Sequence, residues 1–454
     1  MPCPWNGGVS FILDSIPLFL LATGNLHLST LVSDPPLRYT LDAIMSTPAL
    51  RVGILVATDA VEHTYLPTLR SLSSHFDLTT IYASDEDIAL RYRNEFNITH
   101  HAATANDVLH HPDVDVVLNL LPFEYHEPYT VAALETGKHV MVEAPVTLSI
   151  QGLRRIRAAT QKGATVRGVN DSGPKLFVGC PRRYAPCFTE VFKKELASLD
   201  RILYARCRNI AGPLHVPAPK ATNGTNGTTG SANGATTVSN PKHFHALLAD
   251  VFGSAEDLTA DRVAFCRFLG NLGVHDLSVM RESLGLPDAV ANVAITDPFY
   301  SAIFHYSHSV AESHPFILLY EAGVDAVPRC DAHLTVYGAN KTVSVQYDFP
   351  YPGTGICQEQ AVRVVVEETE TELQSNENGS GNGHAVRPRV KRTETVSSSA
   401  EAYERQFLAL HAYFTNAADE VKTDGKDALM DLRLLNLIFE HYDRQCGTIR
   451  TPLG

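Results

Sequence analysis

The chain lacks the features that would assign it to a membrane or to a nucleic acid. No stretch reaches the roughly 20 apolar residues that a membrane-spanning helix requires. Lysine and arginine number 37 against 50 aspartate and glutamate residues, which gives a formal charge of −13. Nucleic acids and anionic membranes are bound by clustered cations, so we expect neither as a partner.

Cysteine pairs at regular spacing are also missing. The eight cysteines are scattered, and none stands in a Cys-x-x-Cys arrangement. This pattern is typical of reduced thiols in a cytosolic protein. Histidines cluster at 100–101, 110–111 and 243–245, but without cysteine or carboxylate partners at recognised spacings. We therefore predict no metal site.

The amino-terminal segment shows no well-formed secretory signal. Residues 11–23 are apolar but short, Asp14 interrupts them, and no positive residue precedes them. Met45 opens the string MSTPALRVGIL, which looks like an ordinary amino-terminus running into a first strand. We interpret residues 1–44 as an extension or a mis-assigned start, and we expect a cytoplasmic protein.

Strands and helices alternate in the first half of the chain. Apolar runs of strand length occupy residues 50–56, 78–83, 114–121 and 139–142, with helices predicted at 60–74, 87–96 and 128–136. A helix at 149–161 and strands at 166–169 and 177–180 follow. Buried runs joined by helices indicate a doubly wound parallel sheet, and we place this Rossmann-like α/β domain at residues 45–170.

The second half, residues 171–454, shows longer strand runs that predict an α+β domain with a mostly antiparallel sheet. These strands are expected at 201–208, 289–296, 302–306, 316–321, 333–337, 342–347 and 362–367, with helices at 400–419 and 426–443. Two segments, 220–240 and 374–399, are rich in Gly, Asn, Ser and Thr and contain few apolar residues. They cannot bury enough surface to order themselves, so we predict flexible surface insertions.

Residues 114–149 carry the most specific pattern in the chain. They are predicted to form a strand, a turn with Pro122 and His126, a helix, a second strand and a closing Glu143-Ala144-Pro145. This string resembles the nucleotide-domain signature of the glucose-fructose oxidoreductase/inositol dehydrogenase/MocA family. In that family the tripeptide is usually Glu-Lys-Pro, with its lysine in the active site. Here Ala144 takes the place of the lysine.

The resemblance implies a Rossmann domain that binds NAD or NADP, a second domain for a small-molecule substrate, and a homo-oligomer formed through the sheet of the second domain. The cofactor would lie at the carboxyl ends of the first strands. The residues expected to line it are Thr58, Ser84, Leu121, Pro122, His126, Glu143 and Pro145.

The glycine turn of a dinucleotide fold is missing. Such a fold normally places Gly-x-Gly-x-x-Gly after the first strand, where backbone N–H groups meet the pyrophosphate. Residues 56–62 read VATDAVE instead. Asp59 and Glu62 predict a capping box whose carboxylates would repel a pyrophosphate, although Thr58 and the helix dipole can still serve. After the second strand, Ser84 leaves room for a 2′-phosphate and Asp85 opposes it, so both NAD and NADP stay open.

A second motif carries the candidate catalytic residues. Asn271-Leu-Gly-Val-His275 resembles the family's Asp-x-Gly-x-His, with an amide in place of the acid. Histidine has an intrinsic pKa suited to proton transfer near neutrality, so we assign His275 the acid/base role, with Asn271 and Tyr184 as further catalytic candidates. A histidine that simply hydrogen-bonds at a helix start is the structural alternative.

Two arginines are candidates for substrate binding. Arg182 and Arg183 stand in GCPRRYAPCF, which resembles the family segment that lines the substrate cleft. The alternative is a surface loop that grips a helix.

Two functions follow from the resemblance. The first is an NAD(P)-dependent oxidoreductase that transfers a hydride to or from a hydroxyl or carbonyl group of a small polar or sugar-like substrate. The second is a non-catalytic nucleotide-binding regulator resembling the yeast galactose repressor. The retained His275 favours the enzyme, whereas the replacement of the lysine and of the acid favours the regulator.

Overall fold

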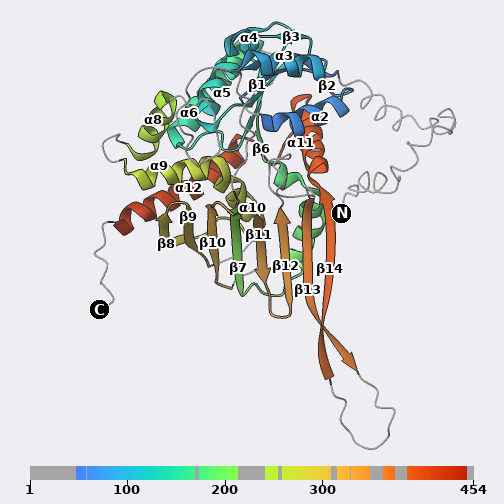
Figure 1. Cartoon of the computed structure of the whole chain (residues 1–454), viewed down its shortest axis with the longest axis vertical. Coiled ribbons are helices and arrows are strands. Elements are labelled where there is room, and N and C mark those ends of the chain that lie inside the picture. The colour runs from blue at the N-terminus through green and yellow to red at the C-terminus, as the bar shows by residue number, and fades with distance from the viewer. Residues whose placement is uncertain are drawn as a thin grey trace, which may run out of the picture. The chain divides into compact units, whose positions relative to one another are not determined.

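Two β-sheets organise the chain, one parallel and the other mostly antiparallel (Figure 1). The computed structural model describes residues 48–57, 59–168, 173–212, 241–253, 258–307, 314–327, 329–347, 361–373 and 386–446. All of these except Pro48 belong to one unit, residues 49–454. The predicted insertion at 220–240, the extension at 1–44 and Thr58 lie outside the described residues.

The parallel sheet has six strands in the order β3-β2-β1-β4-β5-β6. They are β1 (Leu50–Val56), β2 (Phe76–Ala83), β3 (His100–His101), β4 (Val116–Leu120), β5 (His139–Glu143) and β6 (Leu176–Gly179). β4 is buried at every position and β1 at nearly every one, because helices cover both faces of the sheet. This order reverses direction between β1 and β4 and confirms the predicted doubly wound sheet.

Helices lie on both faces of the parallel sheet. They are η4 (Asp59–His63), α2 (Tyr65–Ser71), α3 (Glu86–Glu95), α4 (Ala105–His110), η5 (Phe123–Tyr125), α5 (His126–Glu135) and α6 (Ile150–Arg167). The α2 and α3 helices share one core with α11 (Ser399–Phe414), and α4, α5 and α6 share the core of the other face. Gly137 follows α5 with φ +81°, so the predicted glycine stop is confirmed.

The second sheet has eight strands in the order β14-β13-β12-β11-β7-β10-β9-β8. They are β7 (Tyr204–Ala211), β8 (Ala289–Thr296), β9 (Phe299–Tyr306), β10 (Phe316–Val324), β11 (Cys330–Tyr337), β12 (Lys341–Tyr347), β13 (Ala361–Leu373) and β14 (Val386–Ser398). Every neighbouring pair is antiparallel except β7 with β10. The predicted α+β architecture is therefore confirmed.

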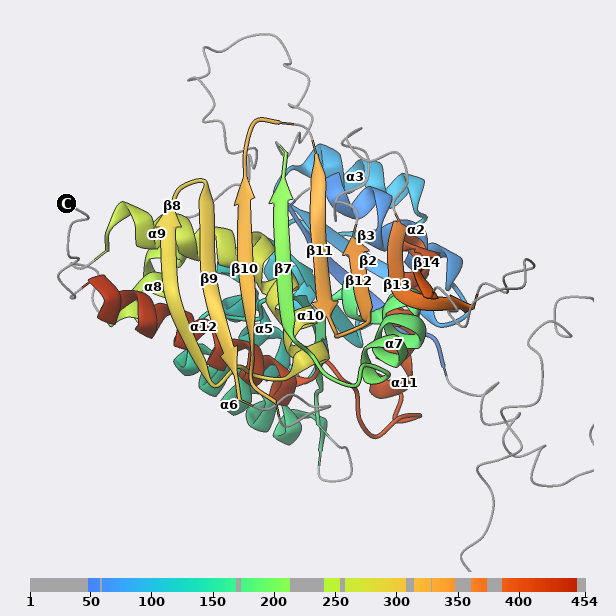
Figure 2. The ribbon, with the colours of Figure 1, turned by 90° about the horizontal axis from the view of Figure 1, so that it is seen from below.

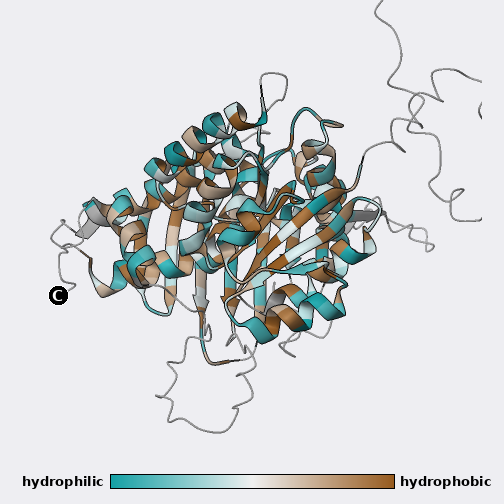
Figure 3. Ribbon diagram, turned by 90° about the horizontal axis from the view of Figure 1, so that it is seen from above, coloured by the Kyte–Doolittle hydropathy of each residue, from teal (hydrophilic) through white to brown (hydrophobic). Residues whose placement is uncertain are grey.

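Helices cover one face of this second sheet, as the view from below shows (Figure 2). They are η6 (Pro181–Tyr184), η7 (Cys187–Phe192), α7 (Lys193–Ala197), α8 (Pro241–Phe252), α9 (Ala260–Phe268), η8 (Leu269–Gly273), α10 (Val274–Leu284) and α12 (Gly425–Cys446). Hydrophobic segments concentrate along the strands, while the helices alternate hydrophilic and hydrophobic turns (Figure 3). Within the described residues, no helix is both long and apolar enough to cross a membrane.

Two local predictions are wrong. The strand expected at 166–169 is not formed up to residue 168, because α6 continues through Arg167 and ends at Gly168 with φ +103°. The helix expected at 60–74 is split into η4 and α2. Glu62 does not close the predicted capping box in the described contacts. Its carboxylate instead lies 2.8 Å from Arg91 and accepts a hydrogen bond from the Tyr92 hydroxyl.

The insertion predicted at 374–399 is also partly wrong, because residues 386–398 form β14 and pair with β13. Complementary charges contribute to this pairing. Lys391 lies opposite Glu368, and Arg392 opposite Glu367, each pair within 3.0 Å. Opposite charges that face each other across strands stabilise a sheet without a core. The low apolar content that predicted flexibility did not register this complementarity.

Candidate active site

The carboxyl edge of the parallel sheet opens between β1 and β4. The helix after β1 packs on one face of the sheet and the helix after β4 on the other, so the two connections diverge at this edge. A crevice of this kind is where doubly wound sheets bind their ligands. The fold therefore supplies a place for a dinucleotide, whatever the sequence of the first turn.

His126 joins the turns that follow β4 and β5. It is 2% exposed, with Nδ1 2.7 Å from the Pro145 carbonyl oxygen and Nε2 2.6 Å from the Leu121 carbonyl oxygen. Burial lowers the pKa of His126, and the two carbonyl contacts oppose that shift. Three of the predicted cofactor-lining residues are thus brought together, and Pro122 lies between them as the start of η5. Both His126 nitrogens face backbone, which makes the histidine a brace for these turns.

Glu143 ends β5 and turns toward α2. Its carboxylate accepts a hydrogen bond of 2.6 Å from the hydroxyl of Tyr65. Burial raises the pKa of Glu143, and the Tyr65 hydrogen bond partly offsets the rise. Tyr65 also packs edge-on against Tyr403 of α11, at 5.1 Å between ring centroids. Sequence analysis missed Tyr65, since nothing in a helix sequence marks which tyrosine reaches a distant strand end.

Fewer described side chains could bind the adenosine half of a dinucleotide, at the ends of β1 and β2. Ser84 is exposed directly after β2. Asp85 caps α3 by accepting a hydrogen bond from the Asp87 backbone N–H, so its carboxylate already has a structural role. The structure fits a dinucleotide at the β4 and β5 ends and offers a turn without glycine at β1.

Ala144 is packed against other parts of the chain. It is 5% exposed and belongs to the core that includes Val274 of α10 and Ala428 of α12. A cavity of about 10 Å³, the room that a single water molecule needs, separates Ala144 from Asp431. A lysine directed into this space would not fit. The loss of the family's lysine is therefore accompanied by packing at its position.

His275 lies at the second position of α10, near both turns. It is partly buried, and its Nδ1 lies 4.0 Å from the Cys180 sulfur. No described residue hydrogen-bonds to its Nε2. Burial, together with the charges of Arg182 and His126, lowers the pKa of His275 to about 3. The surroundings of this histidine therefore disfavour its cation, and its pKa departs from the intrinsic value near neutrality.

The other two catalytic candidates are placed differently. Asn271 lies in η8 with an exposed side chain, and no hydrogen bond joins it to His275. Tyr184 is 7% exposed, and its hydroxyl lies 2.8 Å from Thr423 Oγ1. Burial raises the pKa of Tyr184. Its contacts are those of a packed side chain.

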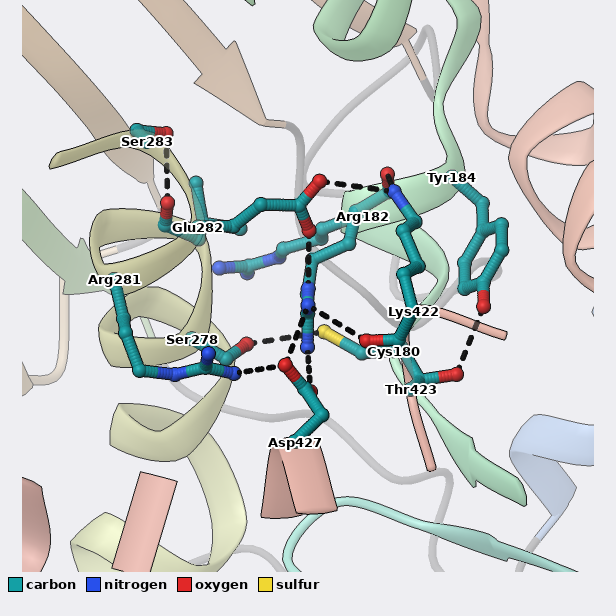
Figure 4. A network of polar contacts seen from close by, with 12 residues as sticks. Cys180, Arg182, Tyr184, Ser278, Arg281, Glu282, Ser283, Lys422, Thr423 and Asp427 are labelled. Atoms are coloured by element: carbon teal, nitrogen blue, oxygen red, sulfur yellow. Dashed lines mark hydrogen bonds and ion pairs between the residues drawn. The ribbon is translucent and has the colours of Figure 1, made fainter. Parts of the chain in front are cut away.

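Arg183 joins η6 to α10 and to the start of α12 through buried ion pairs with Glu282 and Asp427, two residues that Figure 4 labels. Its guanidinium lies 2.5 Å from a carboxylate oxygen of Glu282 and 2.5 Å from one of Asp427. A third contact reaches the Lys422 carbonyl oxygen at 3.2 Å. Arg281 completes the network by bridging Asp427 and Asp431. The Arg183 guanidinium is thus occupied on every side.

Arg182 is buried in a different environment. One of its N–H groups donates to Asp276 Oδ1 at 2.5 Å, and Asn209 donates to the other oxygen of Asp276 at 2.8 Å. Figure 4 shows the Arg182 head directed away from the network, with no dashed line to any residue drawn there. The described residues offer its remaining guanidinium nitrogens no hydrogen bond. Asp276 and Asn209 were not among the predicted site residues.

Among the residues that the structure describes, no group of three histidine, cysteine, aspartate or glutamate side chains could hold a metal ion.

Similarity to known proteins agrees with this architecture. Residues 50–170 match the model of the GFO_IDH_MocA family, described as an oxidoreductase family with an NAD-binding Rossmann fold. A dTDP-3,4-didehydro-2,6-dideoxy-alpha-D-glucose 3-reductase from Streptomyces antibioticus is 31% identical over 27% of this chain and 37% of its own length. A 1,5-anhydro-D-fructose reductase from Ensifer adhaerens is 23% identical over 26% of this chain and 35% of its own. The matches thus span about a third of each relative.

Solved structures share the fold over nearly their whole length. A 3-ketoreductase from Actinomadura kijaniata, in complex with TDP-benzene and NADP, has a TM-score of 0.56 and 14% identity and covers 86% of this chain and 96% of its own. A biliverdin reductase from Synechocystis has a TM-score of 0.53 and 15% identity, with coverage of 86% and 98%. Over residues 50–170, the chain is thus similar to the glucose-fructose oxidoreductase/inositol dehydrogenase/MocA family, whose model describes oxidoreductases with an NAD-binding Rossmann fold.

Proposed function

We propose that this protein is an NAD(P)-dependent oxidoreductase that acts on a hydroxyl or carbonyl group of a small polar or sugar-like substrate. The observation that carries the proposal is the placement of His275. Its Nε2 has no hydrogen bond to a described residue, and it lies beside the turns that end the strands of the nucleotide domain. The sugar reductases and the NADP-bound ketoreductase named above support the substrate class and the cofactor.

The cofactor would be held by the carboxyl edge of the parallel sheet. Leu121 and Pro122 would contact it at the end of β4, and Glu143 at the end of β5, in a frame that His126 braces. Ser84 would face its adenosine half. When bound, the nicotinamide supplies or accepts the hydride at the substrate carbon.

The protein's own groups would act on the substrate oxygen. With its low pKa, His275 is neutral at physiological pH, so it cannot serve as an imidazolium acid. Burial raises the pKa of Cys180, which keeps the thiol protonated and able to face Nδ1 of His275. The remaining proton of His275 would then lie on Nε2 and donate a hydrogen bond to the carbonyl oxygen. The negative charge that develops on that oxygen during reduction would be neutralised by a proton from solvent water.

The test is a titration of the full chain with NADPH and NADH, followed by turnover of a panel of ketones and polyols. We expect cofactor fluorescence to change, and His275→Gln to lower turnover by about 10²-fold while cofactor affinity changes little. Cofactor binding without turnover on any substrate would favour the regulatory alternative. If neither cofactor binds at millimolar concentration, the proposal is wrong.

We further propose that two copies associate through the uncovered face of the second sheet. No described helix covers this face (Figure 2), and it exposes Phe299 by 42%, Ile317 by 41% and Tyr337 by 37%. Its charges are paired within the sheet, Arg206 with Glu321 and Arg208 with Asp331, so the face carries no excess of one sign that would repel a copy of itself. Light scattering should give twice the chain mass, and Ile317→Glu should reduce it to a monomer.

A further inference from the structure

We infer that Arg182 forms a carboxylate-binding subsite, so that the substrate is a small carbonyl or hydroxy compound bearing a carboxylate. This inference rests on the proposed function, because it names the substrate class of the same site. The relatives named above suggest sugars, whereas the charge distribution around Arg182 points to an acid.

Arg182 has N–H donors that no described residue accepts from. A guanidinium presents five N–H groups in a planar fork that matches a carboxylate. The described residues occupy one side of this fork, through Asp276, while the Tyr347 ring lies 5.2 Å from the guanidinium carbon. The side chain keeps 9% of its exposure. A buried cation is costly unless it is paired and hydrogen-bonded, so the remaining N–H groups call for an acceptor.

The hydroxyl of Tyr320, close to Arg182, has no hydrogen bond to a described residue. Tyr320 projects from β10 on the helix-covered face and is 2% exposed. The charges of Asp276 and Arg182 both act on this hydroxyl, which therefore lies near these two side chains. A Cβ at Gly273 would approach this hydroxyl to 3.1 Å. Gly273 immediately precedes the helix that carries His275, so the hydroxyl lies near the start of that helix.

The charges around Arg182 favour a carboxylate over a phosphate as the ligand. Asp276 already balances part of the Arg182 charge, and the nearby Arg183, Arg281 and Lys422 are paired with Glu282, Asp427 and Asp431. The surroundings of Arg182 therefore offer hydrogen-bond donors for one carboxylate but lack the second unpaired cation that a phosphate dianion needs. A carboxylate with a carbonyl or hydroxyl on the next carbon could contact Arg182 with one end and His275 with the other.

Three probes test the inference on the full chain without cofactor. Pyruvate is the carboxylate probe, hydroxyacetone is a neutral ketone of similar size, and inorganic phosphate is the competing anion. Calorimetric titration at low ionic strength should show pyruvate binding at least about tenfold more tightly than either of the others, as expected for a charge-assisted pair. Equal affinity for pyruvate and hydroxyacetone would overturn the inference, and so would a preference for phosphate.

Variants separate binding from folding. Asp276→Asn keeps the shape and removes the competing negative charge, so pyruvate affinity should increase. Arg182→Met combined with Asp276→Asn avoids leaving a buried carboxylate without its cation, and pyruvate affinity should fall by about tenfold or more. Lys193→Met removes an exposed cation from the neighbouring network and is the matched control. A double variant that folds and binds pyruvate like the original chain would overturn the inference.

The same proteins are titrated with NADPH and NADH, so that the two proposals can fail separately. A pyruvate preference that depends on Arg182, without any cofactor binding, would support the subsite and reject the oxidoreductase. Reduction of neutral ketones with bound cofactor and no preference for carboxylates would do the reverse.

Discussion

Arg182 and Arg183 are neighbours in the chain, both are buried, and yet their surroundings differ in one respect. Arg183 contacts two carboxylates and a carbonyl oxygen, and each of those carboxylates has a further cation. Arg182 has one carboxylate, and no described residue accepts from its remaining N–H groups. The network around Arg183 joins η6 to α10 and α12, whereas the Arg182 side faces the candidate histidine.

Adjacent arginines can thus be separated into structural and ligand-binding residues by how many of their N–H groups the protein itself satisfies. Both arginines were predicted to bind substrate, because the pattern Arg-Arg-Tyr does not show which guanidinium is hydrogen-bonded within the protein. A saturated guanidinium has no capacity left for a ligand. An unsaturated one, held beside a helix start and an unpaired tyrosine hydroxyl, keeps that capacity.

The largest effect is expected for Arg183→Met. Removing the arginine leaves Glu282 and Asp427 buried with fewer cations, and breaking a buried network of this kind costs about 3–5 kcal/mol. The free energy of unfolding, measured by urea denaturation, should fall accordingly. Arg405→Met is the matched control, because Arg405 and its partner Glu190 are both more than half exposed. That control should cost less than about 1 kcal/mol. Equal costs for the two variants would remove the distinction between saturated and surface pairs.

Ala144→Lys should have the next largest effect. The cavity beside Ala144 holds no more than a water molecule, so the added side chain must displace α10 or α12. Overpacking of this kind costs about 1–3 kcal/mol. We expect a lower melting temperature and no gain in activity on polyols. Ala144→Met has a similar length without the charge and separates overpacking from electrostatics. A lysine variant that is as stable as the original chain would show that the side chain finds the crevice instead.

A smaller, pH-dependent effect is expected at His275. Its pKa in the folded state is about 3, well below the ordinary value of about 6.5, so the unfolded state binds more protons between these pH values. The stability contributed by the neutral form is complete above pH 6.5 and is lost as the pH falls toward 3. His275→Gln should therefore flatten the fall of the melting temperature between pH 6.5 and pH 4. An unchanged slope would contradict the lowered pKa.

Much of the fold could be predicted from the sequence, because hydrophobic periodicity is local. The strand at Leu50–Val56 and the strand at Ala289–Thr296 have the predicted bounds. The site could be predicted less well. His275 was found through its motif, but Asn209 of β7 and Tyr320 of β10 approach the neighbouring Asp276 from elements far apart in the chain, and no local pattern marks such a meeting. The lowered pKa of His275 could not be predicted for the same reason, since burial is a property of the assembled fold.

The smallest effect is expected in the β13–β14 ribbon, which extends beyond the rest of the sheet (Figure 1). Past Glu368, which lies opposite Lys341 of β12, the two strands pair with each other alone in the described register. Their ion pairs are exposed and screened by salt, unlike those of Arg183. Lys391→Gln should therefore leave the melting temperature of the whole chain unchanged. Lys391→Glu would place three acidic side chains together with Glu368 and Glu370, so the ribbon should become more sensitive to limited proteolysis, most clearly at low ionic strength. A loss of global stability as large as that of Arg183→Met would show that the ribbon supports the sheet, and that exposure does not separate the two kinds of ion pair.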